Sequence, residues 1–246
     1  MPFAKLAFTF FLAVIPAAAQ SRAATNKALT DMVAALGGDA FLRTREIHTS
    51  GRFFSFAKGE LSGGDIFADY IKLPDMERTE FGRDKTKSVS INIGEDGWTI
   101  EGKDGKDVEP QPAARGKEFA ADFKTSFDYV LRYVLNHPAT TIQDLGSEII
   151  DFKRADVVEL RDSVKNLIRF YIDRETHLPM KMQVRRANQA NMREELYANW
   201  HKFDGIMTPL FVGRFKNGVK EMEIRLESAD YDSGLPDNLF TPPASK

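Results

Sequence analysis

The sequence predicts a mainly β protein with helices, of the α+β class, in which the strands pair antiparallel. Beyond residue 44, apolar and polar residues alternate with a period of two over most of the chain, as in half-buried strands. One long helical stripe interrupts this pattern between residues 113 and 135. Because no further long helix is available to connect parallel strands, we expect antiparallel pairing throughout.

The first twenty residues have the order of a secretory signal peptide. Lys5 precedes an apolar run over residues 6–15, which leads into Pro16 and three alanines. This run is shorter than the roughly 20 residues that a membrane-spanning helix needs. We therefore expect a signal peptide over residues 1–19, cleaved near Ala19, and a single exported, soluble domain over residues 20–246 that does not span a membrane.

Composition places the chain among ordinary globular proteins. Hydrophobic residues make up 42% of it and charged residues 28%, so a core can form. The formal charge of −2 becomes −3 if Lys5 leaves with the signal peptide, and both signs are interspersed. This argues against nucleic acid as a partner, since nucleic acid favours a clustered basic face. Without cysteine, the chain has no disulfides and no thiolate zinc site.

The first half of the chain predicts one short helix and then two hairpins. Apolar residues recur at helical spacing over residues 25–36, and Gly37-Gly38 end the run. The expected strands and turns are strands at 47–56 and 66–73 around a turn at 58–59, and strands at 89–93 and 98–100 around a turn at 95–97. Residues 102–112 are polar and rich in Gly, Asp and Pro, which favours an exposed loop.

The second half predicts one long helix followed by strands. The helix is expected over residues 113–135, and Asn136-His137-Pro138 end it. The expected strands lie at 149–152, 157–160, 167–172, 180–184, 196–203, 209–215 and 219–226. The last two flank Asn217-Gly218, a pair suited to a type I′ hairpin turn.

No motif in the sequence predicts a catalytic or metal site. The four histidines lie far apart, and calcium-loop, phosphate-loop, dinucleotide and nucleophile-elbow patterns are absent. We therefore predict no cofactor and no metal, and we do not expect an enzyme. A hydrolase with Ser, His and carboxylate groups assembled in space is the third-ranked hypothesis.

The helical stripe at 113–135 is the candidate binding surface. Phe119, Phe123, Phe127 and Leu131 follow helical spacing, and Met180 and Met182 lie on a later strand. Such a stripe can pack as filled core, or it can line a cavity in which Phe and flexible Met side chains suit an apolar ligand. Both interpretations stay open from the sequence alone.

Several short stretches resemble the periplasmic lipoprotein carriers and the wider group of outer-membrane lipoprotein-sorting proteins. The stretches that carry the resemblance are 35–38, 70–75 with Arg78, 173–179, 203–206 with Pro209, and 239–243. The resemblance implies an incomplete, strongly curved antiparallel β-barrel with helices covering an apolar cavity. In the carriers, that cavity shields the acyl chains of lipoproteins from water. No individual residue role is carried over.

The leading hypothesis is a periplasmic protein that binds an acyl chain, a lipid or an acylated protein cargo between the helical stripe and the sheet. Phe119, Phe123, Phe127, Leu131, Met180 and Met182 are the expected ligand-binding residues. The alternative is a periplasmic sensory or scaffolding domain that binds a partner protein through its sheet.

Overall fold

The computed structural model describes residues 26–83, 87–101 and 107–243. Within these residues, one sheet of 13 strands carries most of the chain, and every neighbouring pair of strands is antiparallel, as predicted. The signal peptide expected over residues 1–19, with its cleavage near Ala19, lies outside the described residues.

The strands follow one another across the sheet with a single departure from chain order. From one edge to the other they are β6 (Asp107–Pro110), β5 (Asp96–Glu101), β4 (Ser88–Ile93), β3 (Met76–Phe81), β2 (Glu60–Lys72), β1 (Glu46–Ala57), β13 (Val219–Tyr231), β12 (Ile206–Lys216), β11 (Arg193–Phe203), β10 (Pro179–Arg185), β9 (Leu167–Asp173), β8 (Lys153–Arg161) and β7 (Thr141–Ile150). The helical elements are α1 (Lys27–Leu36), α2 (Asp39–Arg43), α3 (Ala113–Phe123), α4 (Phe127–Tyr129), the π-helical turn η3 (Val130–Val134) and the 3₁₀ turn η4 (Asp237–Phe240).

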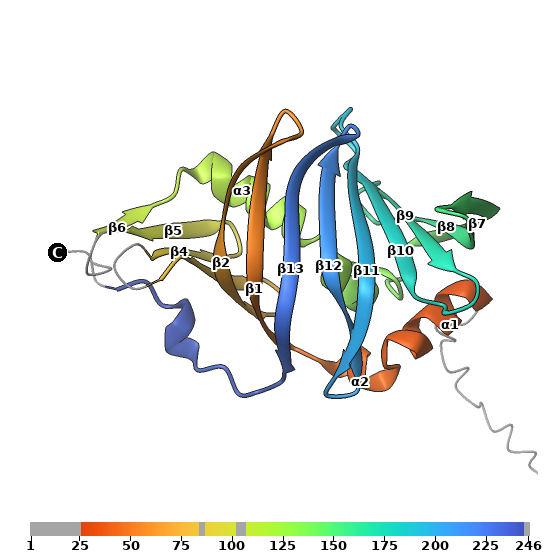
Figure 1. Ribbon diagram of the computed structural model, residues 1–246, viewed down its shortest axis with the longest axis horizontal. Coiled ribbons are helices and arrows are strands. Elements are labelled where there is room, and N and C mark those ends of the chain that lie inside the picture. The colour runs from red at the N-terminus through yellow and green to blue at the C-terminus, as the bar shows by residue number, and fades with distance from the viewer. Residues whose placement is uncertain (1–25, 84–86, 102–106, 244–246) are drawn as a thin grey trace, which may run out of the picture.

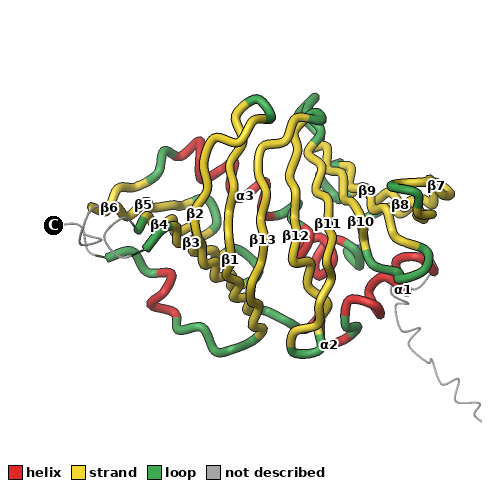
Figure 2. Tube along the Cα trace, viewed as in Figure 1, coloured by secondary structure: helices red, strands yellow, loops and turns green. Residues whose placement is uncertain are grey.

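The sheet is curved and unclosed, with β6 and β7 at its two ends. Figure 1 shows the long central strands in front and α3 behind them, on the concave side. Figure 2 shows the same arrangement by element type, with strands forming the continuous layer and helices placed against it. The curved antiparallel sheet covered by helices, which the resemblance implies, is thereby confirmed.

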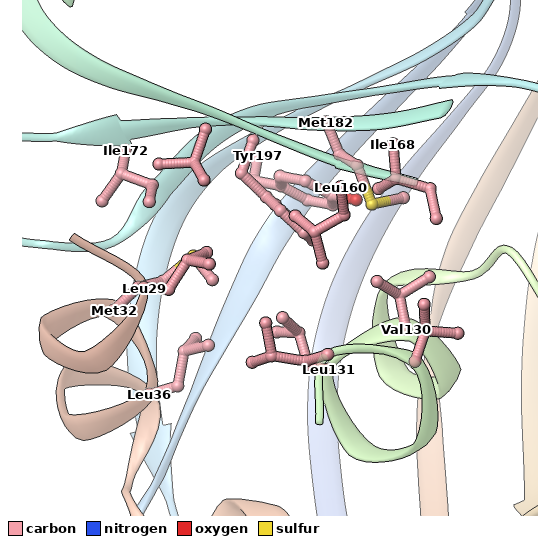
Figure 3. Packing of buried hydrophobic residues seen from close by; sticks show 14 of the residues in the cluster. Leu29, Met32, Leu36, Val130, Leu131, Leu160, Ile168, Ile172, Met182 and Tyr197 are labelled. Atoms are coloured by element: carbon pink, nitrogen blue, oxygen red, sulfur yellow. The ribbon is translucent and has the colours of Figure 1, made fainter. Parts of the chain in front are cut away.

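The largest packed core lies between the helices and one end of the sheet. In Figure 3, Leu29 and Met32 of α1 and Leu131 of η3 point toward Ile168 of β9 and Met182 of β10. All five side chains are fully buried. The helical spacing of the α1 side chains, together with Gly37 as the residue that ends the helix, confirms the N-terminal helix predicted from the sequence.

The first and last strands of the described chain, β1 and β13, pair with each other near the centre of the sheet. The register runs from Ile47 opposite Tyr231 to Ser55 opposite Met222, with a bulge at Gly51. A Cβ at Gly51 would lie 2.1 Å from the backbone oxygen of Arg225, so only glycine allows this approach. The hairpin of β12 and β13 turns at Asn217 and Gly218, both with positive φ, as the sequence predicts.

The prediction of a single long helix over residues 113–135 is wrong. The helix ends at Phe123 and resumes at Phe127, because Thr125 and Ser126 bind the backbone themselves. The Thr125 hydroxyl donates to the Ala121 and Asp122 carbonyls, and the Ser126 hydroxyl accepts from the Tyr129 amide as the cap of the next turn. Phe127 therefore starts a segment with a new direction.

The structure differs from the predicted strands and loops at three further places. β3 has no counterpart in the predicted elements, because its alternate positions Glu77 and Thr79 are polar although they face inward. Residues 107–110 of the expected loop form the edge strand β6, whereas residues 102–106 lie outside the described residues. Of the expected strand at 149–152, Ile149 and Ile150 are the end of β7, whereas Asp151 and Phe152 have positive φ and form the hairpin turn, with the Phe152 side chain fully exposed.

Candidate functional site

A cavity of about 440 Å³ lies between the concave face of the sheet and the segment formed by α3 and α4. Strands β1, β2 and β3 form one part of its wall, and β11, β12 and β13 form the other. Its apolar and aromatic lining consists of Phe41, Ile47, Phe53, Phe67, Ile71, Leu73, Phe81, Phe119, Phe123, Phe127, Tyr197, Met207, Pro209, Val212, Met222, Ile224, Leu226 and Tyr231. Period-two alternation places most of the strand residues of this set on the concave face.

The predicted aromatic residues lie at the cavity. Phe119 and Phe123 of α3 have ring centroids 5.5 Å apart, and both line the cavity. Phe123 also packs against Ile47 and Leu73 of the facing strands and loop. Phe127 of α4 lines the cavity at its border with the main core, with its ring 5.2 Å from that of Tyr197. Ligand binding by these three residues stays a prediction.

The other three predicted residues lie outside the cavity lining. Leu131 and Met182 are fully buried in the packed core of Figure 3. Met180 packs against Val157 and Tyr171, on the opposite face of the sheet from Met182. A register shift between Pro179 and Lys181 explains this, because a bulge breaks the alternation that would place both methionines on one face. The structure therefore brings the phenylalanines together but not the methionines.

An ion-pair network joins α3 to the sheet at one side of the cavity. Arg193 of β11 contacts the Asp122 carboxylate at 2.9 Å and donates to the Thr125 carbonyl at 2.7 Å. Arg214 of β12 contacts Glu195 at 2.9 Å. Burial opposes ionisation of Glu195, but Arg214 and Arg193 outweigh it and hold its pKa below the ordinary value. These charges are satisfied by one another and fix the end of α3 over the sheet.

Two further carboxylates face the cavity from β2 and β3. Burial raises the pKa of Asp69 to about 6, even though Asp69 accepts a 2.8 Å hydrogen bond from the Thr79 hydroxyl. Burial and the neighbouring charge of Asp69 raise the pKa of Glu77 well above its ordinary range. Both side chains are half-buried. The sequence analysis did not single them out, although Asp69 stands between Phe67 and Ile71 in the alternating pattern.

A larger cleft of about 640 Å³ lies against the opposite face of α3. Polar and charged side chains dominate its rim, among them Lys117, Lys124, His137, Asn188 and Gln189. An apolar ligand fits the smaller cavity better, because rings and aliphatic side chains supply most of that wall.

No group of three or more His, Cys, Asp or Glu side chains within the described part of the chain is arranged to hold a metal ion. Among the helices of these same residues, none is both long and apolar enough to cross a membrane.

Compared by sequence, the chain matches no family profile and no curated protein. Three solved structures share its fold. An outer membrane lipoprotein-sorting protein domain from Vibrio parahaemolyticus is 15% identical, with a TM-score of 0.56 over 87% of this chain and 94% of that one. A DUF1329 family protein from Desulfovibrio piger is 15% identical, with a TM-score of 0.58 over 88% and 98%. A LolA superfamily protein from Nitrosomonas europaea is 12% identical, with a TM-score of 0.51 over 85% and 96%.

At these identities the likeness defines the fold. The chain has the architecture of the lipoprotein-sorting proteins, as the short stretches of its sequence imply.

Proposed function

We propose that the protein is an exported carrier that binds an acyl chain or a lipid in the cavity between α3 and the sheet. The observation that carries the proposal is a volume of about 440 Å³ with a predominantly apolar and aromatic wall. Small-molecule sites occupy roughly 300 to 1,000 Å³ and have such walls. An acyl chain gains about 0.8 kcal/mol for each CH₂ group that it removes from water.

Phe119, Phe123 and Phe127 are the proposed contacts from the helical side. They come from two short segments whose ends are fixed by Ser126 and by Arg193. The packed core around Leu131 and Met182 then serves as the rigid support beside the cavity. The fold neighbours include a protein described as sorting outer membrane lipoproteins, which makes a lipid or an acylated protein the favoured cargo.

Export to the periplasm completes the proposal and is supported by the signal peptide pattern over residues 1–19. Native mass spectrometry and lipid extraction on protein from the periplasmic fraction, prepared without detergent, test both parts. We expect the measured mass of a chain that starts at Gln20, together with one bound lipid or acylated cargo. A protein that carries no ligand and also takes up no added apolar probe would contradict the carrier proposal.

A substitution that fills the cavity with a larger side chain tests the location of the site more directly than lipid extraction does. Thr49 of β1 faces the cavity, so Thr49→Trp should occupy part of its volume without removing core side chains. We expect the affinity for a pyrene-labelled fatty alcohol, measured by fluorescence titration, to fall roughly tenfold or more through steric exclusion.

The matched control is Leu61→Trp, which places the same ring at a strand position that is 65% exposed. Circular dichroism and thermal melting establish that both variants are folded. If Thr49→Trp binds the alcohol as tightly as Leu61→Trp does, the ligand lies elsewhere.

A further inference from the structure

The charges that line the cavity are unbalanced. Five carboxylates and two guanidinium groups reach its wall. Three of these carboxylates have a cation beside them: Asp122 pairs with Arg193, Glu195 with Arg214, and Asp128 with Arg132. Asp69 and Glu77 have no ion-pair partner within the described residues, so the cavity keeps two uncompensated acids.

Asp69 and Glu77 lie side by side on the concave face. Asp69 of β2 is directly opposite Thr79 of β3, and Glu77 is opposite Ile71. The two acids are therefore diagonal neighbours on one face, with backbone positions roughly 7 to 8 Å apart. The Thr79 hydroxyl donates a hydrogen bond to the Asp69 carboxylate, whereas the Glu77 carboxylate accepts none from the described residues.

Arg214 does not satisfy this pair. It is the cation whose charge acts on Glu77, but its own hydrogen bonds go to Glu195, at 3.0 Å from Nε and 2.9 Å from Nη2. Raised pKa values at Asp69 and Glu77 agree with this geometry, because burial outweighs the hydrogen bond from Thr79 at Asp69 and the attraction of the more distant Arg214 at Glu77. An acid that is partly removed from water without an ion-pair partner lowers the stability of the empty protein.

Aromatic rings surround the two acids on the same face. Phe67 precedes Asp69 by two residues on β2 and is opposite Phe81 of β3. Phe81 in turn makes an edge contact with Phe53 of β1, at 5.2 Å between ring centroids. Carboxylates among aromatic faces are the surroundings that stabilise a desolvated ammonium group, through charge pairing and cation–π attraction.

We propose that the cavity binds an amphiphile with a protonated amine beside its apolar chain, and that Asp69 and Glu77 hold the ammonium group. This inference rests on the proposed function and names the ligand class of the same cavity. The ammonium donates hydrogen bonds to the two carboxylates, while the chain lies along the phenylalanines. A fatty acid of the same length is disfavoured, because its carboxylate would meet two acids and no available cation.

Three probes of one chain length test the proposal: dodecylamine, dodecanol and dodecanoate, titrated into the mature protein at pH 7.5 by calorimetry below their aggregation limits. We expect the amine to bind roughly tenfold or more tighter than the alcohol, the range for one hydrogen bond between charged groups, and dodecanoate to bind weakest. In the double variant Asp69→Asn with Glu77→Gln, the ratio of amine to alcohol affinity should fall to about one, because no charge remains to pair with the ammonium.

The double variant Glu60→Gln with Asp96→Asn is the matched control, since it removes two exposed acids elsewhere. It should keep the preference for the amine, which separates local pairing from a change of net charge. Equal affinities for amine and alcohol in the parent protein would overturn this inference and leave the carrier proposal standing. Absence of binding by all three probes would overturn both.

Discussion

At the residue scale, Asp69 couples stability to pH. Its pKa is raised from 3.8 to about 6 in the folded protein, so the unfolded chain ionises first as pH rises. The folded state then loses stability between about pH 4 and pH 6 and keeps that loss above it. Asp69→Asn should therefore raise the free energy of unfolding by about 3 kcal/mol at pH 7.5 and change it little at pH 4.

Urea denaturation at the two pH values measures this difference. Glu60→Gln, at an exposed position of the same strand, is the control and should change neither value. A gain for Asp69→Asn that is equal at pH 4 and pH 7.5 would show that ionisation is not its cause.

The same residues show how far a sequence predicts a site. Phe119 and Phe123 were predicted from helical spacing, and the structure places both at the cavity. Asp69 and Glu77 were not, because an acid in a period-two pattern indicates a solvent-facing position. That face points inward because the sheet curves and α3 lies over it. The alternation of residues along one strand indicates neither feature.

At the scale of elements, close packing of α3 depends on Gly116. A Cβ at this position would lie 1.8 Å from the Glu95 carbonyl oxygen in the turn between β4 and β5. Alanine normally stabilises a helix interior by about 1 kcal/mol relative to glycine. Here the clash outweighs that gain, so Gly116→Ala should lower the free energy of unfolding by about 2 kcal/mol or more.

Chemical denaturation tests whether Gly116→Ala lowers the free energy of unfolding instead of raising it. Lys117→Ala, at the next and exposed position of α3, should change stability by less than about 0.5 kcal/mol. If Gly116→Ala stabilises the protein, α3 does not rest on the turn at Glu95.

The helical segment also shows why element boundaries were partly unpredictable. Phe119, Phe123 and Phe127 keep helical spacing across Thr125 and Ser126, so the pattern favours one helix. Whether such hydroxyls cap a new turn or stay within the helix depends on tertiary packing. Here Phe127 packs against Phe170 and Tyr197, and this contact accompanies the change of direction at Ser126.

At the scale of the whole molecule, the resemblance predicted the architecture but not which part of the interior is filled. The same apolar periodicity produces a close-packed core around Met182 and a cavity beside Phe123. The difference lies in which side chains fill the space: those of α1 and η3 pack against β8 to β10, whereas Phe119, Phe123 and Phe127 over the central strands leave a cavity. Side-chain type does not determine that spacing.

The pairing of β1 with β13 joins the two halves of the sheet, so it controls both the cavity and the stability of the molecule. The backbone approach at Gly51 leaves 2.1 Å between an added Cβ and the Arg225 oxygen. Gly51→Ala should separate the strands there and lower the free energy of unfolding by about 3 kcal/mol or more. Because β1 and β13 both line the cavity, affinity for the fatty alcohol should fall as well.

Gly63→Ala on the neighbouring strand is the matched control, since its Cβ would meet only the Ser55 hydroxyl, at 3.1 Å, and a side chain can rotate away. Denaturant titration and probe binding on the same samples distinguish the two substitutions. Loss of stability at Gly51 without loss of binding would show that the cavity is formed within one half of the sheet. Loss of both would show that binding requires the two halves to be joined.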